Sequence, residues 1–348
     1  MFRNSRYYLP VMLMLLLASC IKRYDPNIDS SDKFKYVITG SVNKGDSVQR
    51  LYISTSSLLS RPRIIAITGC SVKIIDGKGN KYIAKDVGKG NYEAIIPESE
   101  LVTGNTFMVD IQVAGGAHII SDFDRIQDCP EVDSVFYIRE DIPTSNPYFP
   151  TRGIRFYMNL NAETFYCRNY RIEAIETWEY TAPFPDYADR RVCWVTSNIR
   201  SIFDFTTQNQ TANIYTLYPL HFVDNYSSQR LRYMYSLLIN QYSLSEAAFT
   251  FWEKMRINSS DQGGLYENQP FQVSGNLHNL SNPDQQVLGF FGASAKKSKR
   301  IFVSDVPGLP NQYIDCRPAY WPEIAAPECL DCTALVGGTN VKPKYWPN

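Results

Sequence analysis

Histidine is scarce in this chain of 348 residues, which contains only His118, His221 and His278. Histidine is the commonest side chain in general acid/base catalysis, and none of the three lies in a recognisable catalytic pattern. The sequence also lacks a G-x-S-x-G elbow, an H-E-x-x-H helix, a Walker A loop and an EF-hand loop. We therefore predict no catalytic residue, no metal site and no cofactor, and we expect the protein not to be an enzyme.

An excess of charge of one sign is missing as well. Lys and Arg total 35, Asp and Glu total 35, and the sequence pI is about 6.8. A protein that binds nucleic acid needs a positive potential to follow the phosphates, so we expect no nucleic-acid partner. The chain is 44% hydrophobic and 14% aromatic, which excludes intrinsic disorder and allows a large core.

Long apolar runs are absent after the N-terminus. Val11 to Ala18 (VMLMLLLA) is too short to span a bilayer, but it suits a signal peptide because Arg3 and Arg6 precede it. The stretch Leu17-Ala18-Ser19-Cys20 that follows resembles the bacterial lipobox, in which the cysteine carries a diacylglycerol. We therefore expect a signal peptide over residues 1–19 and lipid attachment at Cys20.

The residues after Cys20 predict where the lipoprotein is sorted. Ile21 stands where enterobacterial lipoproteins that stay in the inner membrane have Asp, so the outer membrane is the expected location, with its cell surface favoured over its periplasmic face. Residues 20–33 are polar and are expected to form a lipidated tether. The lipid would be the membrane anchor, because no later segment has 18 consecutive apolar residues.

Seven cysteines remain besides Cys20, and the oxidising cell envelope permits disulfides. The odd number leaves at least one thiol free, which we expect to be buried. A redox Cys-x-x-Cys or a zinc site is disfavoured near the C-terminus, because the tail is rich in Pro and Gly and no His is nearby. Disulfides that pin this tail are the favoured interpretation, without a defined pairing; the candidates are Cys193, Cys316, Cys329 and Cys332.

The pattern of the folded part predicts a mainly β protein. Short alternating strands, and a hairpin signal at Asp76-Gly77, indicate an immunoglobulin-like sandwich over residues 34–125. The Pro-rich residues 126–150 are expected to cross to a larger β-rich domain over residues 151–348, which ends in an irregular tail. In the strand at 170–180, period two places Glu173, Thr177 and Glu179 on the solvent side.

One helix is expected near residues 243–257. Ser243 and Glu246 fit a capping box, and an apolar stripe at helical spacing follows. The stripe consists of Leu244, Ala247, Ala248, Phe251, Trp252 and Met255.

Other features have both a structural and a functional interpretation. The basic run Lys296 to Arg300 favours a solvated loop, with contact to lipid phosphates or an acidic partner as the alternative. The tyrosines at 226, 233, 235 and 242 favour the core over ligand stacking. Glu173, Glu176 and Glu179 favour a charged strand face over a glycosidase pair.

Several stretches together resemble a known family. They include Tyr36 to Gly40, Cys193-Trp194, Gln241 to Ser245 and, as the most specific, the ending from Cys329 to Trp346. The chain resembles the Bacteroidota lipoproteins grouped as domain of unknown function 4249 over nearly its whole mature length. Genes of that family commonly lie beside TonB-dependent outer-membrane receptors, so the resemblance implies an accessory role in uptake.

Three functions are therefore carried forward. The leading expectation is a lipid-anchored outer-membrane accessory or binding protein, the partner of a TonB-dependent receptor barrel in nutrient uptake. The first alternative is a structural or assembly factor of the outer membrane. The second is an envelope hydrolase whose site forms no sequence motif, because a fold does not determine a function.

Overall fold

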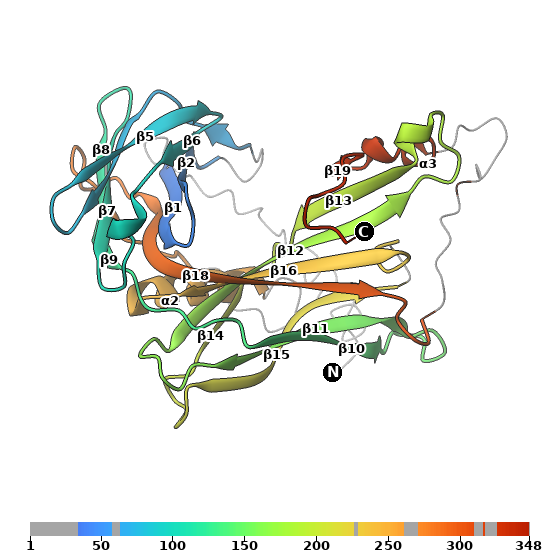
Figure 1. Cartoon of the computed structure of the whole chain (residues 1–348). Helices are drawn as coiled ribbons and strands as arrows, with labels where there is room; N and C mark the ends of the chain where they lie inside the picture. The colour runs from blue at the N-terminus through green and yellow to red at the C-terminus, as the bar shows by residue number, and fades with distance from the viewer. Residues whose placement is uncertain are drawn as a thin grey trace, which may run out of the picture.

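Strands dominate the computed structural model, which describes residues 34–57, 63–225, 229–260, 271–309, 316 and 326–347. They form two β-sandwiches (Figure 1). The expected mainly β fold is confirmed, with an immunoglobulin-like N-terminal sandwich, a larger β-rich part and few helices. The predicted signal peptide, Cys20 and the tether lie outside the described residues.

The first sandwich has two facing sheets around one core. One sheet contains β1 (Tyr36–Lys44), β2 (Gln49–Thr55), β3 (Ile65–Ala66) and β6 (Asn91–Ala94). The other contains β4 (Ser71–Asp76), β7 (Thr106–Gln112), β8 (His118–Ser121), β9 (Asp124–Arg125) and β17 (Leu277–Asn279). Strand β5 (Lys81–Gly88) belongs to both, because its first half pairs with β4 and its second half with β6.

The predicted hairpin at Asp76-Gly77 joins β4 to β5, but its loop is longer than a two-residue turn. Ile75 pairs with Lys81, and Gly79, at φ 88°, has the positive φ rather than Gly77. The buried carboxylate of Asp76 organises this loop by accepting hydrogen bonds from the amides of Lys78 and Asn80, each at 2.9 Å. The turn is therefore set by an Asp side chain that replaces missing backbone partners.

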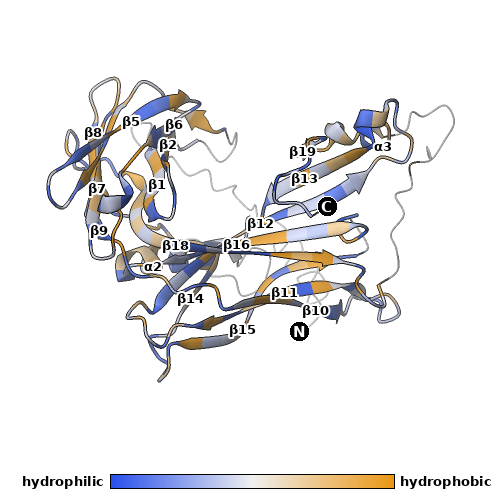
Figure 2. Ribbon diagram, viewed as in Figure 1, coloured by the Kyte–Doolittle hydropathy of each residue, from blue (hydrophilic) through white to orange (hydrophobic). Residues whose placement is uncertain are grey.

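The second sandwich packs a large sheet on a small one. The large sheet contains β12 (Asn169–Thr181), β13 (Val192–Asn198), β14 (Phe203–Thr206), β16 (Met234–Ser243), β18 (Leu288–Ser304) and β19 (Gly338–Thr339). The small sheet contains β10 (Ser134–Ile142), β11 (Thr151–Asn161) and β15 (Ile214–Asp224). Residues 134–142, inside the segment expected to cross between domains, thus form a strand. Figure 2 shows hydrophobic stretches on β16 and at the end of β18, which contribute to the core between these sheets.

Strand β18 joins the two sandwiches. Residues 288–295 pair in parallel with β1, and residues 296–304 pair antiparallel with β16 (Figure 1). Taken alone, the residues at 287–291 and 300–303 predict two separate late strands, and the structure joins these stretches in one strand. Hydrogen bonding therefore runs without a break from the first sandwich into the second.

The prediction of a solvated loop at Lys296 to Arg300 is wrong, because the whole run lies inside β18. Its charges are used internally. Lys296 and Lys297 form ion pairs with Asp46 and Glu131, while Lys299 donates to the carbonyl of Asp133 at 2.6 Å. The run therefore supports strand pairing and loop packing.

The helix is α2 (Glu246–Ser260), and it begins later than predicted. Ser245, not Ser243, caps it, since the Ser245 hydroxyl accepts the amide of Ala248 at 3.1 Å. Ser243 is instead the fully buried last residue of β16, and its hydroxyl donates to the carbonyl of Gln127 at 2.8 Å. The shorter helices are η2 (Glu98–Glu100), η3 (Ala188–Arg190), α3 (Pro327–Leu330) and η4 (Cys332–Ala334).

The outer face of the large sheet is not open to solvent along its whole length. Thr177, predicted on the solvent side, is 0% exposed. Its hydroxyl lies 3.0 Å from that of Tyr345, whose ring also stacks on Arg300 at 3.6 Å from the centroid. The end of the C-terminal tail thus covers this face, an arrangement that strand periodicity alone does not reveal.

Candidate functional site

A pocket of about 150 Å³ lies where the two sandwiches meet, and we call it the seam pocket. Both sandwiches and α2 contribute to its wall, together with the first half of β18. The polar and aromatic side chains that line it include Thr39, Ser41, Asp124, Arg171, Glu173, Tyr242, Trp252 and Ser294.

Arg171 is the central cation of the seam pocket. Its guanidinium carbon lies 4.2 Å from the ring centroid of Trp252 and 4.8 Å from that of Tyr242. It also donates to Glu173 at 2.9 Å, and the Tyr242 hydroxyl donates to the same carboxylate at 2.7 Å. The sheet register produces this cluster, because Arg171 and Tyr242 are directly opposite each other on β12 and β16.

The cluster fixes the charge of Glu173. Burial disfavours its ionised form, but the charge of Arg171 and the hydrogen bond from Tyr242 outweigh burial, so the pKa of Glu173 is lowered. Burial, and after it the same carboxylate, raises the pKa of Tyr242. Glu173 is therefore an ionised hydrogen-bond acceptor at neutral pH and is poorly suited to act as a general acid.

Asp124 is the second carboxylate of the seam pocket and has a different environment. It is 6% exposed and accepts hydrogen bonds from the amides of Arg125 at 3.0 Å and Ala293 at 2.8 Å. Burial raises the pKa of Asp124 despite these bonds. The pocket thus combines a stacked cation, a fixed anion, a desolvated carboxylate and several hydroxyls, a set able to orient a small polar molecule.

Sequence reasoning did not find this pocket. It placed Glu173 on an exposed strand face and Trp252 in a helix core stripe, whereas the two side chains lie on one pocket wall. Phe251 is 7% exposed and does belong to the core, but Ala247 is exposed. The alternation of residues along β12 predicted correctly that Glu173 lies on the face opposite to Ile172 and Ala174. It could not predict that segments distant in the chain cover this face.

A second polar cluster surrounds Glu176, between the sheets of the second sandwich. Glu176 is 3% exposed and accepts hydrogen bonds from Arg230 at 3.1 Å and from the buried Tyr235 at 3.0 Å. His221 lies 3.8 Å from the carboxylate, and Arg230 stacks on Trp178 at 4.5 Å. Burial lowers the pKa of His221, partly offset by the attraction of Glu176.

The three glutamates of β12 do not form a glycosidase pair. Glu173 faces the seam pocket, whereas Glu176 is an odd number of residues away and faces the intersheet core. Glu173 and Glu179 share a face but are six residues apart, about 20 Å along a strand. Paired glycosidase carboxylates stand about 5–10 Å apart.

The tyrosines expected in the core mostly lie there. Tyr235 is 0% exposed and Tyr242 6%, while Tyr233 is half-buried. Tyr242 has a double role, since it is buried and also lines the seam pocket. Tyr226 lies outside the described residues.

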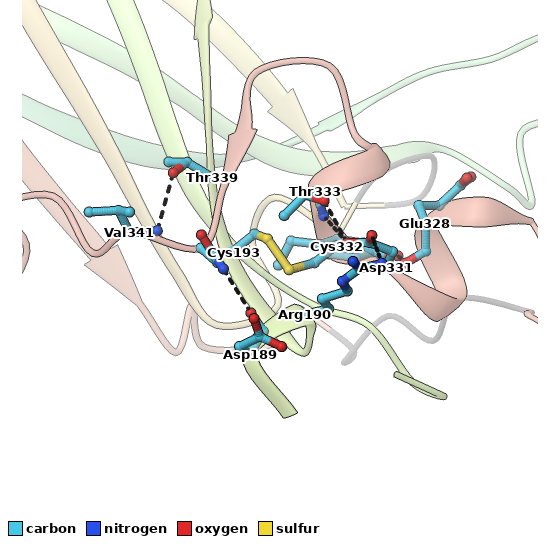
Figure 3. The surroundings of a disulfide bond; sticks show 11 residues. Asp189, Arg190, Cys193, Glu328, Asp331, Cys332, Thr333, Thr339 and Val341 are labelled. Carbon is cyan, nitrogen blue, oxygen red and sulfur yellow. Dashed lines mark hydrogen bonds and ion pairs between the residues drawn. A yellow bond between two sulfur atoms is a disulfide. The ribbon is translucent and has the colours of Figure 1, made fainter. Parts of the chain in front are cut away.

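The candidate cysteines form two disulfides, Cys193–Cys332 and Cys316–Cys329. The first ties the tail to β13, and Figure 3 shows it beside the ion pair between Arg190 and Asp331, whose atoms are 2.9 Å apart. The tail is therefore disulfide-pinned, as expected. The remaining described cysteines, Cys70, Cys129 and Cys167, are free and buried.

Neither a membrane-spanning helix nor a cluster of metal ligands is found in the described part of the chain. No helix there combines the length and hydrophobicity needed to cross a membrane. Within the same ranges, no three His, Cys, Asp or Glu side chains come together as ligands for a metal ion.

Comparison with known proteins places the chain in a family. A family model described as Domain of unknown function (DUF4249) matches residues 21–300, which confirms the resemblance found in the sequence. No curated protein matches the chain. The match includes both sandwiches through most of β18, and the seam pocket lies within it. This chain is a member of the DUF4249 family.

Proposed function

We propose that this protein is a lipid-anchored accessory protein of the outer membrane that binds a small polar ligand and works as the partner of a TonB-dependent receptor in nutrient uptake. The observation that carries the proposal is the lipobox ending at Cys20, directly before a polar segment and a folded two-sandwich body. A lipid at Cys20 would hold that body at one membrane.

The length of the tether supports a partner in the same membrane. Residues 20–33 precede Phe34, the first described residue, and a chain of that length reaches at most about 50 Å. Two proteins held on one membrane at this range have a high effective concentration, so a weak pairwise interface suffices for function.

The seam pocket supports the binding role. Arg171 and Glu173 are held rigidly by Trp252 and Tyr242, so they are positioned before a ligand arrives. Preorganised polar groups at the junction of two β units form a common kind of small-molecule site.

The proposal is tested by isolating the lipoprotein from bacterial membranes in mild detergent and measuring uptake in a deletion strain. We expect a TonB-dependent receptor to copurify in stoichiometric amount, and deletion to lower uptake of its substrate while receptor abundance is unchanged. Cys20→Ala should reproduce the deletion, whereas Cys70→Ala removes a buried free thiol and leaves the anchor intact.

The other outcomes separate the alternatives. Copurification of assembly machinery, with lower receptor abundance in the deletion strain, would favour the assembly factor. A protein that isolates alone and turns over an envelope polymer would favour the hydrolase. Unchanged uptake with no copurifying receptor would reject the accessory role.

A further inference from the structure

Strand register brings three chain segments to one end of the first sandwich. Tyr36, at the start of β1, pairs with Thr55 at the end of β2, and Thr55 also pairs with Ile65 of β3. Next to them, the amide of Ile53 donates to the carbonyl of Gly90, in the turn between β5 and β6, at 2.8 Å. We call this end the anchor tip, and it consists of residues 34–35, 63–66 and 85–90.

Apolar side chains at the anchor tip are exposed. Ile64 is 83% exposed, Val87 55%, Phe34 50% and Ile65 43%. Figure 2 shows hydrophobic colour at the strand ends beside β2 and β6. Isolated exposed apolar residues are ordinary, but several on adjoining segments mark a contact surface.

The charges of the anchor tip are mainly positive. Its one acidic residue is Asp86, whose two carboxylate oxygens accept the amides of Gly69 and Gly88, each at 2.7 Å. One further exposed acid, Asp284, lies in a neighbouring segment. That segment contacts the tip because Lys35 donates a hydrogen bond to the side chain of Gln286. The basic residues of the tip are Lys35, Arg63, Lys85 and Lys89.

The turn at the anchor tip holds one of its lysines in an unusual conformation. Lys89 has φ 52°, between Gly88 at 91° and Gly90 at 78°. A lysine rarely adopts this left-handed region, which costs backbone energy relative to glycine or asparagine. The turn therefore keeps an exposed cation at its centre at some expense in stability.

From this surface we infer that the anchor tip rests on the anionic lipid headgroups of the membrane leaflet that holds the Cys20 lipid. Exposed isoleucine and valine side chains beside Lys and Arg are the combination that binds the interface of an anionic membrane. The position of the surface selects the membrane over a protein partner, because the described chain begins at this tip, at Phe34. The lipid and the tip thus lie at opposite ends of one short tether.

The inference rests on the proposed lipidation and adds an orientation to it. With the anchor tip on the bilayer, the β5–β6 turn would lie at the lipid surface and the opposite end of β5, at Lys81, would lie away from it. A receptor would then meet the sides of the two sandwiches, where the seam pocket lies, and not the tip.

The test attaches an environment-sensitive fluorophore at the tip of the full mature lipoprotein, reconstituted in vesicles of phosphatidylethanolamine and phosphatidylglycerol. Ile64→Cys and Val87→Cys carry the probe, and Lys81→Cys, at an exposed position at the other end of β5, is the matched control. The native free thiols are buried, so labelling is directed to the new cysteine. We expect blue-shifted emission and quenching by brominated acyl chains at 64 and 87, but not at 81.

Charge reversal provides the second arm. Arg63→Glu combined with Lys89→Glu should abolish the blue shift at position 64 on anionic vesicles. Water-like emission at 64 and 87, or an equal shift at all three positions, would overturn the inference even if the protein floats with the vesicles. If the protein does not float, the lipidation has failed. A variant with a hexahistidine tag in place of residues 1–20, held on nickel-chelating lipid, then tests the contact of the tip with the membrane by the same readout.

Discussion

The hydroxyl of Ser294 donates to the side-chain oxygen of Asn43 at 2.9 Å, although the two residues are 251 positions apart in the chain. Asn43 lies near the end of β1, and Ser294 is its register partner on β18. One residue further along, Ala295 donates its amide to Ser243 of β16, at 3.3 Å. The two sandwiches are thus hydrogen-bonded to one strand within a few residues.

Shared use of β18 predicts that the two sandwiches unfold together. Phe291→Ala, in the core of the first sandwich, should cost about 3–5 kcal/mol, and Leu237→Ala, in the core of the second, about 2–5 kcal/mol, because both side chains are fully buried. Each variant should lower the midpoint of the same single transition in urea, followed by fluorescence and circular dichroism. Two separated transitions, with each variant moving only one, would contradict the prediction.

Local patterns predicted most strands because their residues alternate along one chain segment. Strand β4, for example, buries every second residue. Strand β18 could not be predicted as one strand in this way, since the basic run between the strands indicated at 287–291 and 300–303 suggests a loop. Its course is decided by two distant partners, β1 and β16, and by acids such as Asp46 that neutralise its lysines.

The seam pocket could not be predicted from local sequence patterns, for a similar reason. Alternation along β12 assigned Glu173 to the correct face, and helical spacing found Phe251 in the core. That Trp252 meets Arg171 depends on how α2 packs across β12 and β18, which only the assembled fold determines. The disulfides of the tail were easier to predict, because an oxidising compartment and a tail poor in regular structure favour disulfides.

Glu176 should contribute strongly to stability. Glu176→Gln removes a buried negative charge and leaves Arg230 without its ionic partner, so we expect a loss of about 2–3 kcal/mol, reduced from the full cost of a buried pair because Arg230 is partly exposed. Glu179→Gln is the matched control on the same strand, half-buried and outside this cluster. Urea denaturation compares the two. Equal losses would show that the Glu176 cluster adds nothing specific.

Protonation of His221 should lower the stability of the folded protein in mild acid. Its pKa is lowered in the folded protein by burial, with Arg230 and Arg155 acting in the same direction and Glu176 and Asp224 opposing them. The unfolded chain therefore binds the proton more readily, and stability falls as the pH drops below about 6.5 through the folded pKa. His221→Gln should flatten the change in urea midpoint between pH 7.5 and 5.5. His278→Gln, at an exposed histidine outside the Glu176 cluster, is the matched control.

The two disulfides should contribute different amounts to the free energy of unfolding. Cys193 and Cys332 are 139 residues apart, while Cys316 and Cys329 are 13 apart. In the loop-entropy description, these bridges stabilise the fold by about 5 and about 3 kcal/mol. The Cys193→Ser/Cys332→Ser variant should therefore unfold at lower urea than Cys316→Ser/Cys329→Ser. Non-reducing peptide mapping checks the pairing, and the reverse order of midpoints would contradict the prediction.

Arg171 should control the protonation of the seam pocket. In Arg171→Met, Glu173 keeps its burial and the Tyr242 hydroxyl but loses the cation that lowers its pKa, so that pKa should rise. Because a lowered folded pKa stabilises the protein above the unfolded value, the variant should also lose less stability as the pH falls through the carboxylate range. Titration of side-chain carboxyl signals by NMR measures the first effect and urea midpoints the second. Arg168→Met is the control, since the Arg168 guanidinium donates to the carbonyls of Thr207 and Gln210, each at 3.4 Å, and does not line the seam pocket. A Glu173 pKa that is the same in both variants would show that Arg171 does not set the charge of the pocket.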